Sequence, residues 1–168
     1  DALPISREWG DNVDDWSSHN SPSRVARNWG EQPMRVQAQH YACPYYPVTS
    51  YDVLYKQSSQ HVGGCLWHSF DHQRGYHPDP FYGGLMDVFR QPKYSYYMFM
   101  AQRPAVKNDR NAGSGPMVYI AHEMTPFSGK DVTVYSNCDE VRLTFNKGGK
   151  TYTYKKDKNR PDRKSTRL

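Results

Sequence analysis

One carboxylate near the start of the chain stands where an acidic side chain could take part in catalysis. Glu8 lies in the stretch Pro4–Asp11, which is mostly apolar before Glu8 and is broken at Gly10. Such a pattern predicts a buried strand that ends by projecting its last side chain into a loop. In parallel α/β folds the catalytic groups gather at the carboxyl ends of the strands. Glu8 is therefore a candidate catalytic group, although most glutamates at strand ends are simply solvated.

Aromatic side chains are abundant among the groups that could surround such a carboxylate. The 168 residues include 14 Tyr and four Trp, while the hydrophobic content is only 36%. Tyr and Trp offer an apolar face together with a polar edge. This combination suits a sugar-binding surface, because the C–H faces of a pyranose ring stack on aromatic rings. Most single tyrosines are nevertheless expected to build the core.

Other site chemistries find less support in the sequence. His68 and His72 have a spacing used by metal ligands, but the pair spans a strand end and a loop, without an HExxH or CxxC motif. Cys43, Cys65 and Cys138 are odd in number and widely spaced, which predicts neither a disulfide framework nor a zinc site. No G-x-S-x-G motif indicates a serine hydrolase. We expect no metal and no cofactor.

The net charge of +5 does not predict a nucleic-acid partner. Residues 150–168 hold eight Lys or Arg and two Asp, so this tail carries +6 and the remainder of the chain carries −1. The basic residues thus form a terminal tail instead of a patch on the folded body. No run of 18 apolar residues occurs, so no membrane-spanning helix is expected.

The first two thirds of the chain alternate between strand-like and helix-like patterns. The strand predicted within Pro4–Asp11 is followed by predicted helices at about 31–42 and 51–59. The apolar run 62–70 predicts a second strand, and the spacing of Tyr94, Tyr97, Met98 and Ala101 predicts a helix at about 92–102. This order indicates parallel α/β units whose polar loops lie on one face.

The last third of the chain changes to a period of two. A polar, glycine-rich linker leads into a strand at 117–122, and alternation around Val132–Val134 and Val141–Phe145 predicts two more. The glycines of 147–149 predict a turn into a fourth strand that contains Tyr152 and Tyr154. These elements indicate the beginning of an antiparallel β-sandwich with too few strands to close.

Four motifs in this order resemble glycoside hydrolase family 2, the family of β-galactosidases, β-glucuronidases and β-mannosidases. They are Ser6–Asp11, Val62–Trp67, Gly84–Asp87 with Arg90–Lys93, and Val134–Val141. Each motif alone is modest, but their joint occurrence in one order is specific. The resemblance extends over nearly the whole chain outside its basic tail.

The resemblance implies an α/β plus all-β fold. Residues 1–104 would form the last two strand–helix units of a (β/α)8 TIM barrel, and 105–116 would be a linker. Residues 117–161 would form part of an immunoglobulin-like β-sandwich. Residues 162–168 match a translated sequencing-library adapter, so we expect them to be a non-native tail.

The resemblance also implies roles for individual residues. Glu8 matches the position of the nucleophile, which forms a covalent glycosyl-enzyme and gives retention of configuration. Trp67 matches an aromatic residue that stacks on the sugar. Asp71, His72 and His19 are expected on loops at the same face, where they could bind sugar hydroxyls. The expected partner is thus a carbohydrate.

Two departures from the galactosidase pattern and one missing group qualify this interpretation. Asp11 and Gly83 stand where well-studied galactosidases have a histidine and an asparagine. The family's acid/base is the Glu of an Asn-Glu pair, which does not occur here, and Glu31, Glu123 and Glu140 are poor substitutes. We expect the parent protein to hydrolyse terminal β-galactosides and this chain alone to be inactive. A specificity for β-glucuronides or β-mannosides, and a non-catalytic carbohydrate-binding module, are the alternatives.

Overall fold

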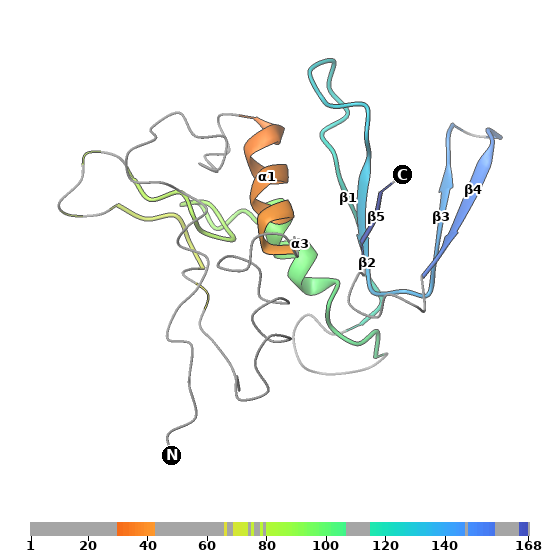
Figure 1. Ribbon diagram of the computed structural model, residues 1–168, viewed down its shortest axis with the longest axis horizontal. Coiled ribbons are helices and arrows are strands. Elements are labelled where there is room, and N and C mark those ends of the chain that lie inside the picture. The colour runs from red at the N-terminus through yellow and green to blue at the C-terminus, as the bar shows by residue number, and fades with distance from the viewer. Residues whose placement is uncertain are drawn as a thin grey trace. The chain divides into compact units, whose positions relative to one another are not determined.

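The protein combines helices with small antiparallel sheets in the computed structural model (Figure 1). The chain divides into two compact units, Asp1–Tyr96 and Tyr97–Leu168. The division falls within a short helix. The residues that the structure describes are 30–42, 66, 69–73, 75, 78, 80–106, 115–146, 148–156 and 165–167.

Helix α1, Glu31–Ala42, has the bounds that the sequence predicts. It follows Gly30, which has a φ of 90°, a conformation that glycine adopts without strain. Glu31 lies in the first turn, where a negative charge is favoured by the helix dipole. Met34, Ala38 and Tyr41 recur along one face and are buried, so this apolar face anchors the helix in the core.

Helix α3, Tyr94–Met100, is shorter than the predicted helix at 92–102. Its start is displaced because Pro92 forms an antiparallel bridge with Met86, and the backbone N–H of Lys93 donates to the carbonyl of Leu85 at 2.9 Å. These tertiary contacts hold the two residues outside the helix. No helix among the described residues is long and apolar enough to cross a membrane.

The predicted strands of the first unit are described only in part. Phe70, at the end of the predicted strand 62–70, forms an isolated parallel bridge with Met86. Of the rest of that strand, only Leu66 and Ser69 belong to the described residues. The strand predicted within residues 4–11 and the helix predicted at 51–59 lie outside them.

The four predicted strands of the second unit are present, and the first is shorter than predicted while the second and third are shifted along the chain. Strands β1, Val118–Ala121, and β2, Thr133–Ser136, pair antiparallel, as do β3, Glu140–Thr144, and β4, Thr151–Lys155. Strand β5, Ser165–Arg167, adds to β2, which gives the order β1-β2-β5 beside the separate β3-β4 pair. No sequence pattern predicted β5, which lies within the expected non-native tail.

The hairpin between β3 and β4 turns at the predicted glycines. Asn146 and Gly148 have φ values of 59° and 83°, and the N–H of Gly149 donates to the carbonyl of Asn146 at 3.2 Å. A Cβ at Gly149 would collide with the carbonyl of Phe145. The turn therefore needs glycine at 149 for space and at 148 for its backbone conformation.

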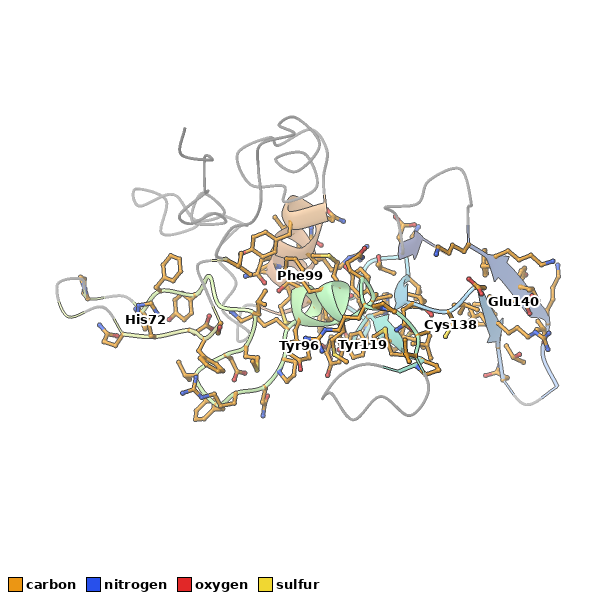
Figure 2. All side chains as sticks on the ribbon, turned by 90° about the horizontal axis from the view of Figure 1, so that it is seen from below. His72, Tyr96, Phe99, Tyr119, Cys138 and Glu140 are labelled. Atoms are coloured by element: carbon orange, nitrogen blue, oxygen red, sulfur yellow. The ribbon has the colours of Figure 1, made fainter. Side chains whose placement is uncertain are left out.

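Asn137 holds the segment that precedes β1 in place. Its Nδ2 donates to the carbonyls of Gly115 and Arg103 at 2.8 and 3.2 Å, and its Oδ1 accepts from the N–H of Met117 at 2.8 Å. Asn137 precedes Cys138, a free thiol that Figure 2 shows on the connection between β2 and β3, so Asn137 lies on this connection too. One amide side chain thus joins three points of the backbone.

Replacing Asn137 with aspartate is expected to lower the free energy of unfolding of this unit by about 1–3 kcal/mol. The carboxylate cannot donate, so two carbonyl groups lose their donor and face a negative charge. Hydrogen exchange of the amides of β1 and β2 in the full-length protein measures the change. Asn146→Asp, in the exposed β3–β4 turn, is the matched control, and equal exchange in the two variants would refute the assignment.

Candidate functional site

Two of the five residues predicted for the site belong to the described part of the chain. Asp71 and His72 lie on the segment that follows Phe70, whereas Glu8, His19 and Trp67 lie outside the described residues. The structure therefore gives the surroundings of Asp71 and His72 and no distance to the other three.

Backbone hydrogen bonds hold this segment on both sides. The N–H of Asp71 donates to the carbonyl of Met86 at 2.9 Å, and the N–H of Met86 donates to the carbonyl of Ser69 at 3.0 Å. His72 and Phe81 exchange a pair of bonds at 3.2 and 2.8 Å. The segment is thus fixed against the stretch 81–86, which overlaps with the motif Gly84–Asp87.

The carboxylate of Asp71 forms a buried ion pair with Lys93. The Nζ of Lys93 lies 2.6 Å from Oδ1 of Asp71, and the two side chains are only 0% and 3% exposed. Lys93 also donates to the carbonyl of Tyr82 at 2.8 Å, and the N–H of Gly84 donates to the same Oδ1 at 3.0 Å. The pair therefore joins the segment after Phe70 to Tyr82 and Gly84 and to the start of α3.

Burial raises the pKa of the Asp71 carboxyl above its ordinary value of 3.8, because the loss of hydration outweighs the other influences. The charge of Lys93 and the hydrogen bonds from Lys93 and Gly84 act in the opposite direction, and the charge of Asp87 adds to the increase. Protonation of Asp71 thus favours the folded state. This part of the stability is complete below pH 3.8 and is lost as the pH rises through the folded-state pKa.

A tight turn brings Lys93 back to Asp71. Oδ1 of Asp87 accepts hydrogen bonds from the N–H groups of Phe89 and Gln91, both at 2.9 Å. Arg90 adopts a φ of 67°, which is uncommon for a residue other than glycine, and its guanidinium lies 3.5 Å from the centre of the Phe70 ring. The turn at 87–91 explains why the motifs Gly84–Asp87 and Arg90–Lys93 occur together.

Two uncharged side chains continue the network into the helices. Gln37 of α1 is fully buried, and its Nε2 donates to the carbonyls of Gly83 and Gly84, both at 3.2 Å. The hydroxyl of Ser95 in α3 donates to Oε1 of Gln37 at 2.6 Å. We name Asp71, Lys93, Gly84, Gln37 and Ser95 the Asp71 cluster. The sequence patterns did not predict that Lys93, Gln37 and Ser95 belong to the site, although Lys93 ends the motif Arg90–Lys93.

Gly84 cannot carry a side chain in this arrangement. A Cβ would overlap with backbone atoms of Phe70, Asp71 and Met86, none of which can rotate away. Gly84→Ala is therefore expected to destabilise this unit by about 2–3 kcal/mol, seen as faster hydrogen exchange of amides in 81–93 of the full-length protein. A Cβ at Gly75 would meet nothing within 4 Å, so Gly75→Ala is the control. Unchanged exchange in Gly84→Ala would contradict the expectation.

His72 packs against an aromatic ring. Its imidazole is partly buried, and its centre lies 5.8 Å from that of the Phe81 ring with an interplanar angle of 56°. Figure 2 shows His72 on an extended segment beyond the helices. Within the described ranges, no group of three or more His, Cys, Asp or Glu could hold a metal ion. The described part of the site therefore offers buried acceptors and donors that can fix a loop, and a histidine that can form hydrogen bonds.

Comparison with known proteins points to glycoside hydrolases. No protein-family model matches the chain. The chain is 29% identical over 125 residues to a β-galactosidase of Thermoanaerobacter pseudethanolicus, an alignment that covers 60% of this chain and 16% of that protein. The chain thus spans about one sixth of the length of this relative. The similarity supports a relationship with glycoside hydrolases.

A solved structure also overlaps with the chain. The crystal structure of a β-glucuronidase from Parabacteroides merdae is 20% identical and superposes with a TM-score of 0.44 over 82% of this chain and 17% of that one. The superposition is too loose to assign the fold.

Proposed function

We propose that the chain is part of a retaining β-glycosidase that hydrolyses terminal β-galactosides. The observation that supports this proposal most is the 29% identity to a β-galactosidase over 125 residues. The four sequence motifs add to it, because they follow one another in the order expected for that family. In this proposal residues 1–104 are the last units of the catalytic barrel, and residues 117–161 begin the β-sandwich that follows it.

The proposed reaction uses Glu8 as the nucleophile. Its carboxylate attacks the anomeric carbon, the glycosidic bond breaks, and the leaving oxygen takes a proton from an acid. Water then loses a proton to the conjugate base of that acid, attacks the same carbon from the face opposite Glu8 and releases the Glu8 carboxylate, so two inversions give net retention. Retaining enzymes hold the two carboxyl groups about 5–5.5 Å apart. We find no candidate for the acid within residues 1–168 and place it elsewhere in the full-length protein.

The sugar ring would stack on Trp67, with His72 and His19 as hydroxyl ligands. Asp71 is the remaining residue for which the sequence predicts a sugar contact. Its carboxylate already accepts hydrogen bonds from Lys93 and Gly84 and is almost fully buried. In this proposal Asp71 therefore supports the sugar site without forming part of its surface.

The experiment that tests the proposal is hydrolysis by the full-length protein of 4-nitrophenyl β-D-galactoside, β-D-glucuronide and β-D-mannoside. We expect the galactoside to have the highest kcat/KM, and NMR of the first product to show the β anomer. The chain 1–168 alone should turn over none of them. An α anomer as first product would refute the retaining mechanism, and turnover by 1–168 would refute the proposed inactivity. A higher kcat/KM on the glucuronide or the mannoside would change the proposed substrate and leave the proposed mechanism as it is.

A further inference from the structure

The Asp71 cluster contains a buried ion pair, Asp71 with Lys93, whose presence is not explained by a gain in stability. Lys93 is fully buried and the Asp71 side chain is 3% exposed, so both ions have lost their hydration. Replacing a buried ion pair with well-packed apolar side chains is often neutral or even stabilising. The 2.6 Å contact between Lys93 Nζ and Asp71 Oδ1 also fixes the geometry of the chain, because it forms only when the two segments lie in one relative position.

The two segments that the pair joins are far apart in sequence. Asp71 follows Trp67 by four residues and immediately precedes His72, both proposed sugar contacts. Lys93 precedes α3. Gln37 of α1 donates hydrogen bonds to the carbonyls of Gly83 and Gly84, and Gly84 also contacts Asp71. The cluster thus attaches the segment that contains Asp71 and His72 to two helices through buried side chains.

We propose that the Asp71–Lys93 pair positions the segment Phe70–His72, and that Asp71 acts on the sugar through its neighbour His72 without touching the sugar itself. The inference rests on the proposed function. Small displacements of a group that contacts the reacting substrate lower the rate strongly. Loss of the pair should therefore reduce catalysis even in a variant that keeps its stability.

The variant that separates positioning from stability is the double change Asp71→Asn and Lys93→Met. The introduced amide would keep an acceptor for the N–H of Gly84, and neither new side chain is charged, so neither member of the pair leaves the other as an uncompensated buried charge. We expect hydrogen exchange in 81–93 to stay near that of the wild-type protein. We expect kcat/KM on 4-nitrophenyl β-D-galactoside to fall about 10- to 100-fold. Asp71→Asn alone, which exchanges one oxygen for an NH2 group, serves as a second variant if the double variant does not fold.

Galactosides that lack one hydroxyl distinguish positioning from direct contact. A positioning pair lowers kcat/KM by the same factor for the galactoside and for each monodeoxy analogue. A direct contact with one hydroxyl gives no further loss on the analogue that lacks it, and this result would overturn the proposal. Recovery of wild-type kcat/KM in the double variant would overturn it too, because the pair would then serve stability alone.

The wild-type protein on the same substrates reports on the proposed function separately. Absence of turnover of all three aryl glycosides would overturn both proposals. Turnover by the wild-type protein, together with unchanged kinetics of both variants, would overturn only the positioning role.

Discussion

Replacing Glu8 with glutamine is expected to lower kcat of the full-length protein on 4-nitrophenyl β-D-galactoside by about 10⁴- to 10⁶-fold. The amide has nearly the size of the carboxylate, but it carries no charge and is a poor nucleophile toward the anomeric carbon. The covalent intermediate therefore cannot form. Binding of the sugar depends on other groups, so KM should change far less than kcat.

The control for this variant is Glu140→Gln. Glu140 lies on β3 and pairs with the exposed Arg142 at 2.8 Å, a surface contact that contributes little. Figure 2 shows Glu140 on this strand. The Glu140→Gln variant should retain wild-type activity. A Glu8→Gln variant with comparable kcat would remove Glu8 from the mechanism.

A smaller side chain at the same position tests the role of the carboxylate more directly. Glu8→Ala leaves space in which azide can attack the anomeric carbon and displace 4-nitrophenolate. One displacement inverts the configuration, so the product should be the α-galactosyl azide. Formation of the β-galactosyl azide would contradict a nucleophilic Glu8. A Glu8→Ala variant that keeps wild-type activity without azide would contradict it as well.

Helix α1 could be predicted from the sequence because its signals are local. The apolar residues Met34, Ala38 and Tyr41 recur at helical spacing, Pro33 is tolerated in the first turn, and Pro44 follows the end. The start of α3 could not be predicted in the same way. Pro92 and Lys93 fit a first helical turn, but contacts with Met86 and Leu85 compete for their backbone.

The Asp71 cluster could likewise be predicted only in part, because most of its contacts join residues that are far apart in sequence. Asp71 and His72 could be named because they follow an apolar run in a polar loop. Gln37 and Ser95 lie among residues of helical spacing, where a polar side chain normally indicates the solvent face. Their hydrogen bonds span 46 and 58 positions of sequence, from Gln37 to Gly83 and to Ser95. Only the tertiary structure turns these side chains into a buried network.

Removal of Lys93 has the largest expected effect on stability. Lys93→Met leaves the Asp71 carboxylate buried beside Gly84 without its cation, and breaking a buried pair in this way costs about 3–5 kcal/mol. The apolar methionine fits the stem of the lysine, so the loss comes from the charge and not from a cavity. The local measurement is hydrogen exchange of amides in α1 and 81–93 of the full-length protein at pH 7.

The destabilisation by Lys93→Met should depend on pH with a definite sign. Lys93 lowers the pKa of Asp71 through its charge and its hydrogen bond, so the variant raises that pKa further above 3.8. Because the folded state then binds a proton more tightly than the unfolded chain, lowering the pH stabilises the variant. The difference from the wild-type protein should be largest at pH 7 and shrink as the pH falls and Asp71 becomes neutral. Lys93→Met combined with Asp71→Asn should lack this trend. A difference between wild type and Lys93→Met that grows as the pH falls would show that Asp71 is not the group left unpaired.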